Sequence, residues 1–297
     1  MQNYTLLYIL GSGHCGSTLL DLLLNGHTQI LGLGEITVLK RYIAIANGAR
    51  YDVYRSSGSP NEKGRLRDWI ETESHSLNDP FWQLVKQHYE DASRATLDQI
   101  DVHPPKWKTL RSWPAKEIER WARPNQILLS CLRQVSGAGI LTDASKSPHR
   151  LYLLQRSGLF NIKVVHLVRD GRAIINSYLR KYGDFGLALR RWAAPTLLAF
   201  YLRRQFAEAN WLQVRYEELV TRPEETLNSI CVFLGISFEH AMLAYRGKPY
   251  FGVGGNRMVE SEDERIFLDE HWKQALSYKH RLAFALAAGW LNRLYGY

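Results

Sequence analysis

Cysteine and long apolar runs are scarce in this chain. Its 297 residues include three cysteines, Cys15, Cys131 and Cys231, and none of them has C-x-x-C spacing. This number and spacing argue against a disulfide framework and suit a reducing compartment, so we expect a cytoplasmic protein. The longest apolar stretches, 18–24 and 282–291, are too short to cross a bilayer. We therefore expect a globular protein without a membrane span.

Positive charge, by contrast, is in excess. The chain has 38 Lys and Arg against 29 Asp and Glu, which gives a net charge of +9 and implies an anionic partner. The basic residues are spread along the sequence, and no aromatic-basic motif of RNA- or DNA-binding proteins is present. We therefore favour a small, multiply charged nucleotide and expect no nucleic-acid partner, while a nucleic-acid binder remains an alternative.

A glycine-rich stretch near the N-terminus lacks the lysine of a standard phosphate loop. The apolar run 6–10 stops at Gly11, three glycines follow within six residues, and a leucine-rich segment with helical spacing begins at Thr18. This pattern predicts a strand, a loop whose backbone N–H groups turn inward, and a helix N-terminus, which together favour an anion. The residues expected at this anion site are Gly11, Ser12, Gly13, His14, Cys15, Gly16, Ser17 and Thr18.

The missing lysine narrows the class of ligand. Gly11, Gly16 and Thr18 match the pattern G-x-x-x-x-G-K-[ST], but Ser17 occupies the lysine position. A nucleoside triphosphate with magnesium needs that lysine on its β- and γ-phosphates, so a smaller anionic group fits this loop better. The loop therefore argues against a P-loop nucleotide kinase, which remains an alternative.

Two further residues follow predicted strands. Glu35 comes after the apolar residues of 30–33, and Lys146 ends the β-type run 138–146. Open α/β sheets gather functional groups at the carboxyl ends of their strands, so both residues are expected near the phosphate loop. Glu35 is a candidate general base, although an acid beside a helix N-terminus is the alternative. Lys146 is a candidate for stabilising developing negative charge, with a solvated lysine as the alternative.

The stretch 161–183 predicts a second anion site. A buried strand over 164–168 is followed by the turn 169–172, which carries two arginines, and then by a helix that contains Ser177. Arginines beside a helix N-terminus suit the bidentate recognition of a phosphate. Two anion sites require one ligand with two separated phosphates.

Two regions are expected to lie outside this α/β core. Between 47 and 124 the composition changes to polar turns and tryptophans, namely Trp69, Trp82, Trp107, Trp113 and Trp121. This predicts a helical and loop insertion over the crevice, where aromatic side chains contact an acceptor or simply pack. At 281–297 a stripe of Leu282, Leu286, Ala287, Trp290 and Leu294 favours a helix docked on the core.

In this order and spacing the motifs resemble the sulfotransferases that use 3′-phosphoadenosine 5′-phosphosulfate (PAPS). The resemblance extends through 214–236 and the glycine-rich segment 252–258. It is strongest to the tyrosylprotein, carbohydrate and bacterial members of the family. The run VRDGRA at 168–173 occurs in the tyrosylprotein enzymes in the same form. It implies one domain over 1–297 with a parallel sheet flanked by helices. It also implies transfer from PAPS to the hydroxyl of a peptide tyrosine, a carbohydrate or a small molecule, without a metal.

The resemblance also implies roles for particular residues. Glu35 follows His14 by 21 positions, as the family's catalytic base follows the basic residue of its loop, and Lys146 corresponds to a lysine that stabilises the transferred group. The remaining residues expected to bind PAPS are Arg169, Ser177, Tyr216, Gly255, Asn256 and Arg257.

One position departs from the family pattern. His14 stands where Lys or Arg is usual, and the charge of an imidazole near pH 7 depends on its surroundings. A catalytically inactive nucleotide-binding module is therefore an alternative. His149 is the second candidate for the base, because another branch of the family uses histidine.

Overall fold

Five parallel strands form the centre of the protein. The computed structural model describes residues 4–48, 76–105, 112–259 and 265–297, and its strands lie in the order β2-β3-β1-β4-β5. Every neighbouring pair is parallel. This arrangement confirms the predicted α/β fold. The strands are β1 Thr5–Leu10, β2 Ile30–Leu31, β3 Ile140–Lys146, β4 Ile162–Val168 and β5 Trp211–Arg215.

The apolar run of β1 is explained by burial on both faces of the sheet. Leu6, Tyr8 and Leu10 belong to one hydrophobic core, whereas Leu7 and Ile9 belong to the other. Successive side chains of a strand point to opposite faces, so a central parallel strand must be apolar at every position.

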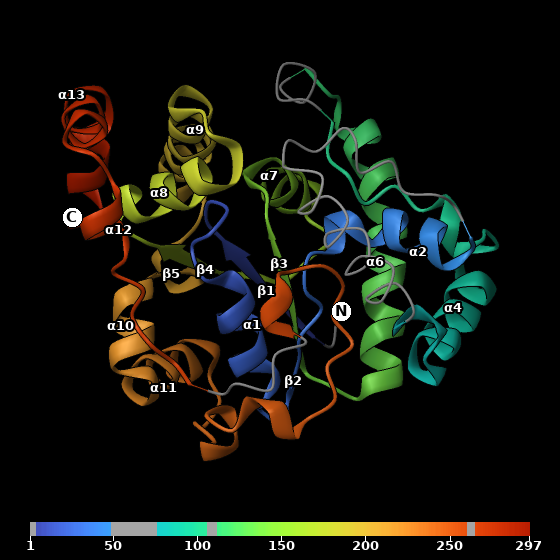
Figure 1. Cartoon of the computed structure of the whole chain (residues 1–297). Coiled ribbons are helices and arrows are strands. Elements are labelled where there is room, and N and C mark those ends of the chain that lie inside the picture. The colour runs from blue at the N-terminus through green and yellow to red at the C-terminus, as the bar shows by residue number, and fades with distance from the viewer. Residues whose placement is uncertain (1–3, 49–75, 106–111, 260–264) are drawn as a thin grey trace.

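Helices cover both faces of this sheet (Figure 1). On one side α2, α4, α6 and α7 pack with the first core, and on the other α1, α8, α10, α11 and α13 pack with the second. The described helices are α1 Ser17–Asn25, α2 Leu39–Ala46, α4 Pro80–Ser93, α6 Ala115–Ser136, α7 Pro148–Ser157, α8 Gly171–Tyr182, α9 Phe185–Arg203, α10 Tyr216–Thr221, α11 Pro223–Leu234, α12 Trp272–Ala275 and α13 Tyr278–Leu294.

The region 47–124 is described in part. Trp82 on α4 and Trp121 on α6 are buried in the first core, so these two side chains pack instead of facing an acceptor. The indole of Trp82 donates to the carbonyl of Phe251 at 2.9 Å. The helix α6 continues through Pro124, which lies inside it. Trp69 and Trp107 lie outside the described residues.

The last helix docks by a different face from the one expected. Leu282, Leu286, Trp290 and Leu294 are 47%, 78%, 50% and 52% exposed, so the expectation that this stripe packs on the core was wrong. The buried contacts come from the opposite side of α13, through Phe284, Ala288 and Leu291. The sequence pattern misled because apolar residues lie on both sides of this helix.

The parallel strands bring the site residues together. All five strands end at the same edge of the sheet, and the segments that follow them carry the glycine-rich loop, Glu35, Lys146, Arg169 and Tyr216. Residues separated by up to two hundred positions therefore meet at one edge, as the rule for open α/β sheets predicts.

Candidate functional site

The glycine-rich loop runs from the end of β1 into α1. Gly16 has a φ of 95° at the N-cap position, and a Cβ there would overlap the ring of Tyr216. Glycine is thus required both by the left-handed backbone and by the close approach of the aromatic ring. No side chain in the described part of the chain caps this helix, and Ser12, Ser17 and Thr18 lie buried around its first turn. Free amides and hydroxyls at a helix N-terminus suit an anion.

Cys15 contributes packing to this loop. Its side chain is fully buried, and a Cβ at Gly11 would lie 2.7 Å from its Sγ. Burial raises the pKa of the thiol, against the opposing effect of Lys146 and the amide of Ser17. Cys15 is therefore a neutral thiol that shapes the loop, not a thiolate nucleophile.

Glu35 and Lys146 form an ion pair at the same edge. Lys146 Nζ lies 2.6 Å from Glu35 Oε1 and 3.2 Å from the carbonyl oxygen of Ala144. The two side chains are 24% and 15% exposed respectively, so both are reachable from solvent but largely shielded. Lys146 has a φ of 61°, a backbone conformation that costs free energy for a non-glycine residue and is found at functional sites. The structure thus joins a carboxylate and an ammonium that lie 111 residues apart in sequence.

His14 lies on the loop in a strongly cationic setting. Its ring is exposed and makes an edge contact with Tyr178, with ring centroids 4.7 Å apart. Burial among the surrounding protein atoms, followed by the charges of Lys181, Arg169, Lys146 and Arg180, lowers its pKa to about 4. Solvent at this exposed residue weakens the effect of burial on the pKa, but the charges of the four cations lower the pKa as well. The imidazole is therefore neutral at pH 7 in the ligand-free protein, which disfavours the cationic role that the family's Lys or Arg would have.

Arg169 connects the loop to the start of α8. Its guanidinium donates to the carbonyl of His14 at 3.0 Å and lies over the ring of Tyr216, 4.2 Å from the centroid. A second nitrogen of the guanidinium approaches the carbonyl and the carboxylate of Asp269 at 3.3 and 3.4 Å. Stacking and hydrogen bonding hold the guanidinium in one orientation beside the loop, as a phosphate-binding arginine requires.

The other residues expected to bind PAPS occupy the same side of the sheet. Ser177 lies within α8, where its hydroxyl donates to the carbonyl of Ala173 at 3.1 Å. The segment with Gly255 lies against α1, since a Cβ at Gly255 would be 3.2 Å from Cγ2 of Thr18. Asn256 is exposed and its Oδ1 accepts from the amide of Met258 at 2.9 Å. Arg257 begins the short 3-10 helix Arg257–Val259, and its side chain lies outside the described part of the structure.

His149, the second candidate for the base, is placed in the first turn of α7. It is half-buried, and burial together with the nearby His103 lowers its pKa. Glu35 is paired with Lys146 at the edge of the sheet.

Three residues at the site were not singled out from the sequence. Asp21 on α1 and Tyr250 share a hydrogen bond of 2.6 Å, and Asp269 contacts Arg169. The signal for Asp21 was a lone carboxylate within a leucine-rich helix, which is rarely buried without a partner. Asp269 lies in a segment with no motif, so its contact depends on the tertiary structure alone.

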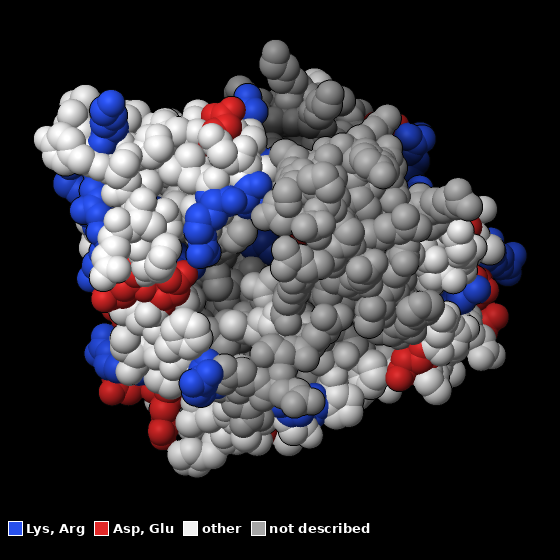
Figure 2. Space-filling model, viewed as in Figure 1, with Lys and Arg blue, Asp and Glu red and all other residues white. Residues whose placement is uncertain are grey.

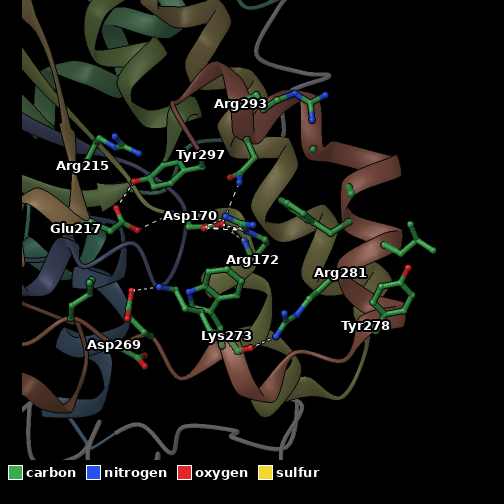
Figure 3. Close-up of a pocket in the computed structure, with 18 residues that line it drawn as sticks. Asp170, Arg172, Arg215, Glu217, Asp269, Lys273, Tyr278, Arg281, Arg293 and Tyr297 are labelled. Carbon is green, nitrogen blue, oxygen red and sulfur yellow. Dashed lines mark hydrogen bonds and ion pairs between the residues drawn. The ribbon is translucent and has the colours of Figure 1, made fainter.

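A large cavity has Asp269 among its lining residues. It has a volume of about 860 Å³ and is lined by residues of α8, α12 and α13 as well as the last residues of the chain (Figure 3). Its acidic side chains have partners: Asp170, for example, pairs with Arg172 at 2.6 Å, and Arg172 stacks on Trp272 at 4.6 Å. None of the loop residues 11–18 lines this cavity. We therefore take the loop, where free amides and cations converge, and not this cavity, as the candidate functional site.

Figure 2 shows Lys and Arg side chains at the upper left of a hollow near the middle of the face viewed, with a patch of Asp and Glu side chains to its lower left. Within the described ranges no cluster of His, Cys, Asp and Glu could hold a metal ion, and no helix there is long and apolar enough to cross a membrane.

The curated proteins that this chain resembles include protein-tyrosine sulfotransferases. Protein-tyrosine sulfotransferase 2 of Gallus gallus is 31% identical over 117 residues, which are 36% of this chain and 31% of that protein. Protein-tyrosine sulfotransferase A of Caenorhabditis elegans is 31% identical over 114 residues, 36% of this chain and 30% of that protein. The matched segment thus spans about a third of each relative's length.

Solved structures show the same fold. The sulfotransferase domain from the Synechococcus PCC 7002 olefin synthase superposes with a TM-score of 0.59 at 21% identity, over 100% of this chain and 96% of that one. The sulfotransferase domain from the curacin biosynthetic pathway gives 0.55 at 17% identity, over 95% and 97%. These likenesses confirm the expected sulfotransferase fold.

The profile of a whole family matches most of the sequence. The profile is described as the sulfotransferase family and aligns with residues 7–240, from the first strand to beyond α11. It therefore includes the glycine-rich loop, Glu35, Lys146 and Arg169. The chain belongs to the sulfotransferase family.

Proposed function

We propose that this enzyme transfers the sulfuryl group of PAPS to an acceptor hydroxyl. The observation that carries the proposal is the Glu35–Lys146 pair, 2.6 Å apart, at the sheet edge that also holds the glycine-rich loop. A base and a cation beside an anion site are what transfer to a hydroxyl requires, since a proton must leave the acceptor while negative charge is stabilised. We further propose that 1–297 acts as one domain.

The two ends of PAPS would be held by different parts of the chain. Free amides of the loop and the hydroxyls of Ser17 and Thr18 suit the 5′-phosphosulfate end. Arg169, with Ser177 and the segment at 255–257, suits the 3′-phosphate, because the guanidinium is already oriented by Tyr216 and the carbonyl of His14. The loop follows β1 and Arg169 follows the neighbouring parallel strand β4, so one nucleotide can engage both.

The chain's own groups then account for the proton and the charge. The Glu35 carboxylate takes the proton of the acceptor hydroxyl, whose oxygen bonds to sulfur while the bond from sulfur to the 5′-phosphate oxygen breaks. The ammonium of Lys146, which pairs with Glu35, also stabilises negative charge on the transferred sulfuryl group. The neutral ring of His14 donates a hydrogen bond to the leaving phosphate. The products are a sulfated acceptor and adenosine 3′,5′-bisphosphate, and no metal is needed for this balance.

The acceptor is proposed by class. The named relatives act on protein tyrosines, as their names state, so a tyrosyl hydroxyl is one candidate beside carbohydrate and small-molecule hydroxyls. No contact in the described residues selects among these, because the acceptor side of the site includes the region 47–124.

A calorimetric titration with adenosine 3′,5′-bisphosphate and with ATP tests the donor. We expect tighter binding of the bisphosphate without magnesium, because the loop lacks the lysine that ATP requires. Tighter binding of ATP would contradict the proposal and favour a kinase. Tight bisphosphate binding without transfer to phenolic, carbohydrate or alcohol acceptors would instead indicate a nucleotide-binding module.

A further inference from the structure

Beyond its first turn, the helix that follows the glycine-rich loop buries two polar side chains. Asp21 and Asn25 on α1 are both 0% exposed, although the helix is otherwise rich in leucine. They are four residues apart, so they lie on the same side of the helix, one turn from each other. A buried carboxylate is costly unless several donors surround it, so its partners have to be strong.

Asp21 accepts hydrogen bonds from three separate segments. Its carboxylate accepts from the amide of Gly34 at 2.9 Å, from the hydroxyl of Tyr250 at 2.6 Å, and from the hydroxyl of Thr142 on β3. Burial raises the pKa of Asp21, and these three donors act against that rise. One side chain thus ties α1, the turn after β2, the strand β3 and the segment around 250 together.

The turn held by Asp21 is the one that carries Glu35. Gly34 has a φ of 64° and lies directly before Glu35, whose own amide donates to the carbonyl of Val253 at 2.6 Å. Val253 in turn donates to the carbonyl of Leu33 at 3.0 Å, and Ala144 donates to the carbonyl of Gly34 at 2.7 Å. The position of Glu35 therefore depends on the placement of two segments, and Asp21 contacts both.

We propose that Asp21 is a positioning residue for Glu35, which holds the Glu35 turn and the segment of Tyr250 against the helix of the glycine-rich loop. The inference rests on the proposed role of Glu35 as the base. Asp21 itself contacts neither the nucleotide nor the acceptor in this account.

Asn25 offers a matched control on the same helix. Its Oδ1 accepts from the amide of Gly32 at 2.9 Å, and its Nδ2 donates to the carbonyl of Pro249 at 3.1 Å. It therefore joins two of the three segments that Asp21 joins, the turn after β2 and the segment around 250, but through residues farther from Glu35. Loss of either side chain should destabilise the fold. Only the loss of Asp21 removes the hydrogen bond that holds Gly34, the residue directly before Glu35.

The test compares Asp21→Asn with Asn25→Ala in the full chain. We expect kcat for sulfuryl transfer to fall about 10- to 100-fold in Asp21→Asn, because a displaced base loses its alignment, while the KM for PAPS and the Kd of adenosine 3′,5′-bisphosphate change less than about threefold. Asn25→Ala should lower the melting temperature to a comparable degree and leave kcat within about threefold. Hydrogen exchange supplies a readout that needs no acceptor: amides 33–36 should exchange faster in Asp21→Asn than in Asn25→Ala.

Three outcomes decide the matter. Equal losses of kcat and equal exchange at 33–36 in the two variants would show a merely structural role and overturn the proposal. Unchanged kcat in Asp21→Asn would also overturn it. If Asp21→Asn does not fold, Tyr250→Phe removes one of the three donors and should still lower kcat several-fold with the bisphosphate Kd retained. Full activity in Glu35→Gln would refute the base assignment itself, which separates that failure from a failure of Asp21.

Discussion

The clearest quantitative prediction concerns Arg169. The side chain is 8% exposed, and its guanidinium is fixed by the carbonyl of His14 at 3.0 Å and by the ring of Tyr216 at 4.2 Å. A charge-assisted hydrogen bond from such a group contributes about 1.5–3 kcal/mol. Arg169→Ala should therefore weaken the binding of adenosine 3′,5′-bisphosphate by roughly 10- to 150-fold.

The assay is calorimetry with two nucleotides and two variants. Adenosine 5′-phosphosulfate lacks the 3′-phosphate, so its affinity should barely respond to Arg169→Ala. Arg172→Ala is the matched control, because Arg172 lies three residues along the chain, pairs with Asp170 at 2.6 Å and faces the separate cavity beside Trp272. An equal loss for both nucleotides in Arg169→Ala would refute the reasoning, since it would mean that the arginine supports the loop instead of binding the phosphate.

Three further predictions follow from the site and the core. Glu35→Gln keeps the shape of the side chain but cannot accept the proton, so the single-turnover rate of transfer should fall on the order of 10²-fold, while the affinity for the bisphosphate is retained. A normal rate would indicate that His149 is the base. Because the pKa of His14 is lowered to about 4, its ring stays neutral above pH 6. His14→Gln should therefore leave the shape of the pH–rate profile from pH 6 to 9 unchanged. A loss of rate at alkaline pH in the wild-type protein alone would show that His14 acts as a cation once the nucleotide is bound. Burial lowers the pKa of His166 in β4 to about 3, so the imidazole is protonated in the unfolded chain before it is protonated in the folded protein. The free energy of unfolding should therefore fall by up to roughly 1.4 kcal/mol per pH unit as the pH drops from 6.5 toward 3. Measured by urea unfolding, this fall should be less steep in His166→Phe, and an equal fall in the two proteins would exclude His166 as its cause.

The central elements of the fold were predictable because their sequence patterns are local. Continuous apolar runs such as 6–10 and 164–168 indicate strands buried on both faces, and glycines at 11, 13 and 16 indicate a loop with unusual backbone geometry. The rule that parallel strands end at one edge then places Glu35 and Lys146 near each other, and the structure shows them in direct contact.

Other features depend on tertiary contacts that no local pattern carries. The lowered pKa of His14 comes from its burial and from cations on α8, β3 and the turn after β4. The contact of Asp269 with Arg169 joins residues 100 positions apart. For α13, both sides of the helix are apolar, so periodicity could not decide which side is buried, and the expectation failed there.

The measurement that tests the central claim most directly is a stoichiometric transfer assay. Wild-type protein and Glu35→Gln are incubated with sulfur-labelled PAPS and, separately, phenolic, carbohydrate and alcohol acceptors, and both adenosine 3′,5′-bisphosphate and labelled acceptor are quantified. The account predicts equal amounts of bisphosphate and sulfated acceptor from the wild-type protein with at least one acceptor class, and a loss of both in Glu35→Gln. Binding of PAPS without transfer to any acceptor, or equal transfer by the two proteins, would contradict it.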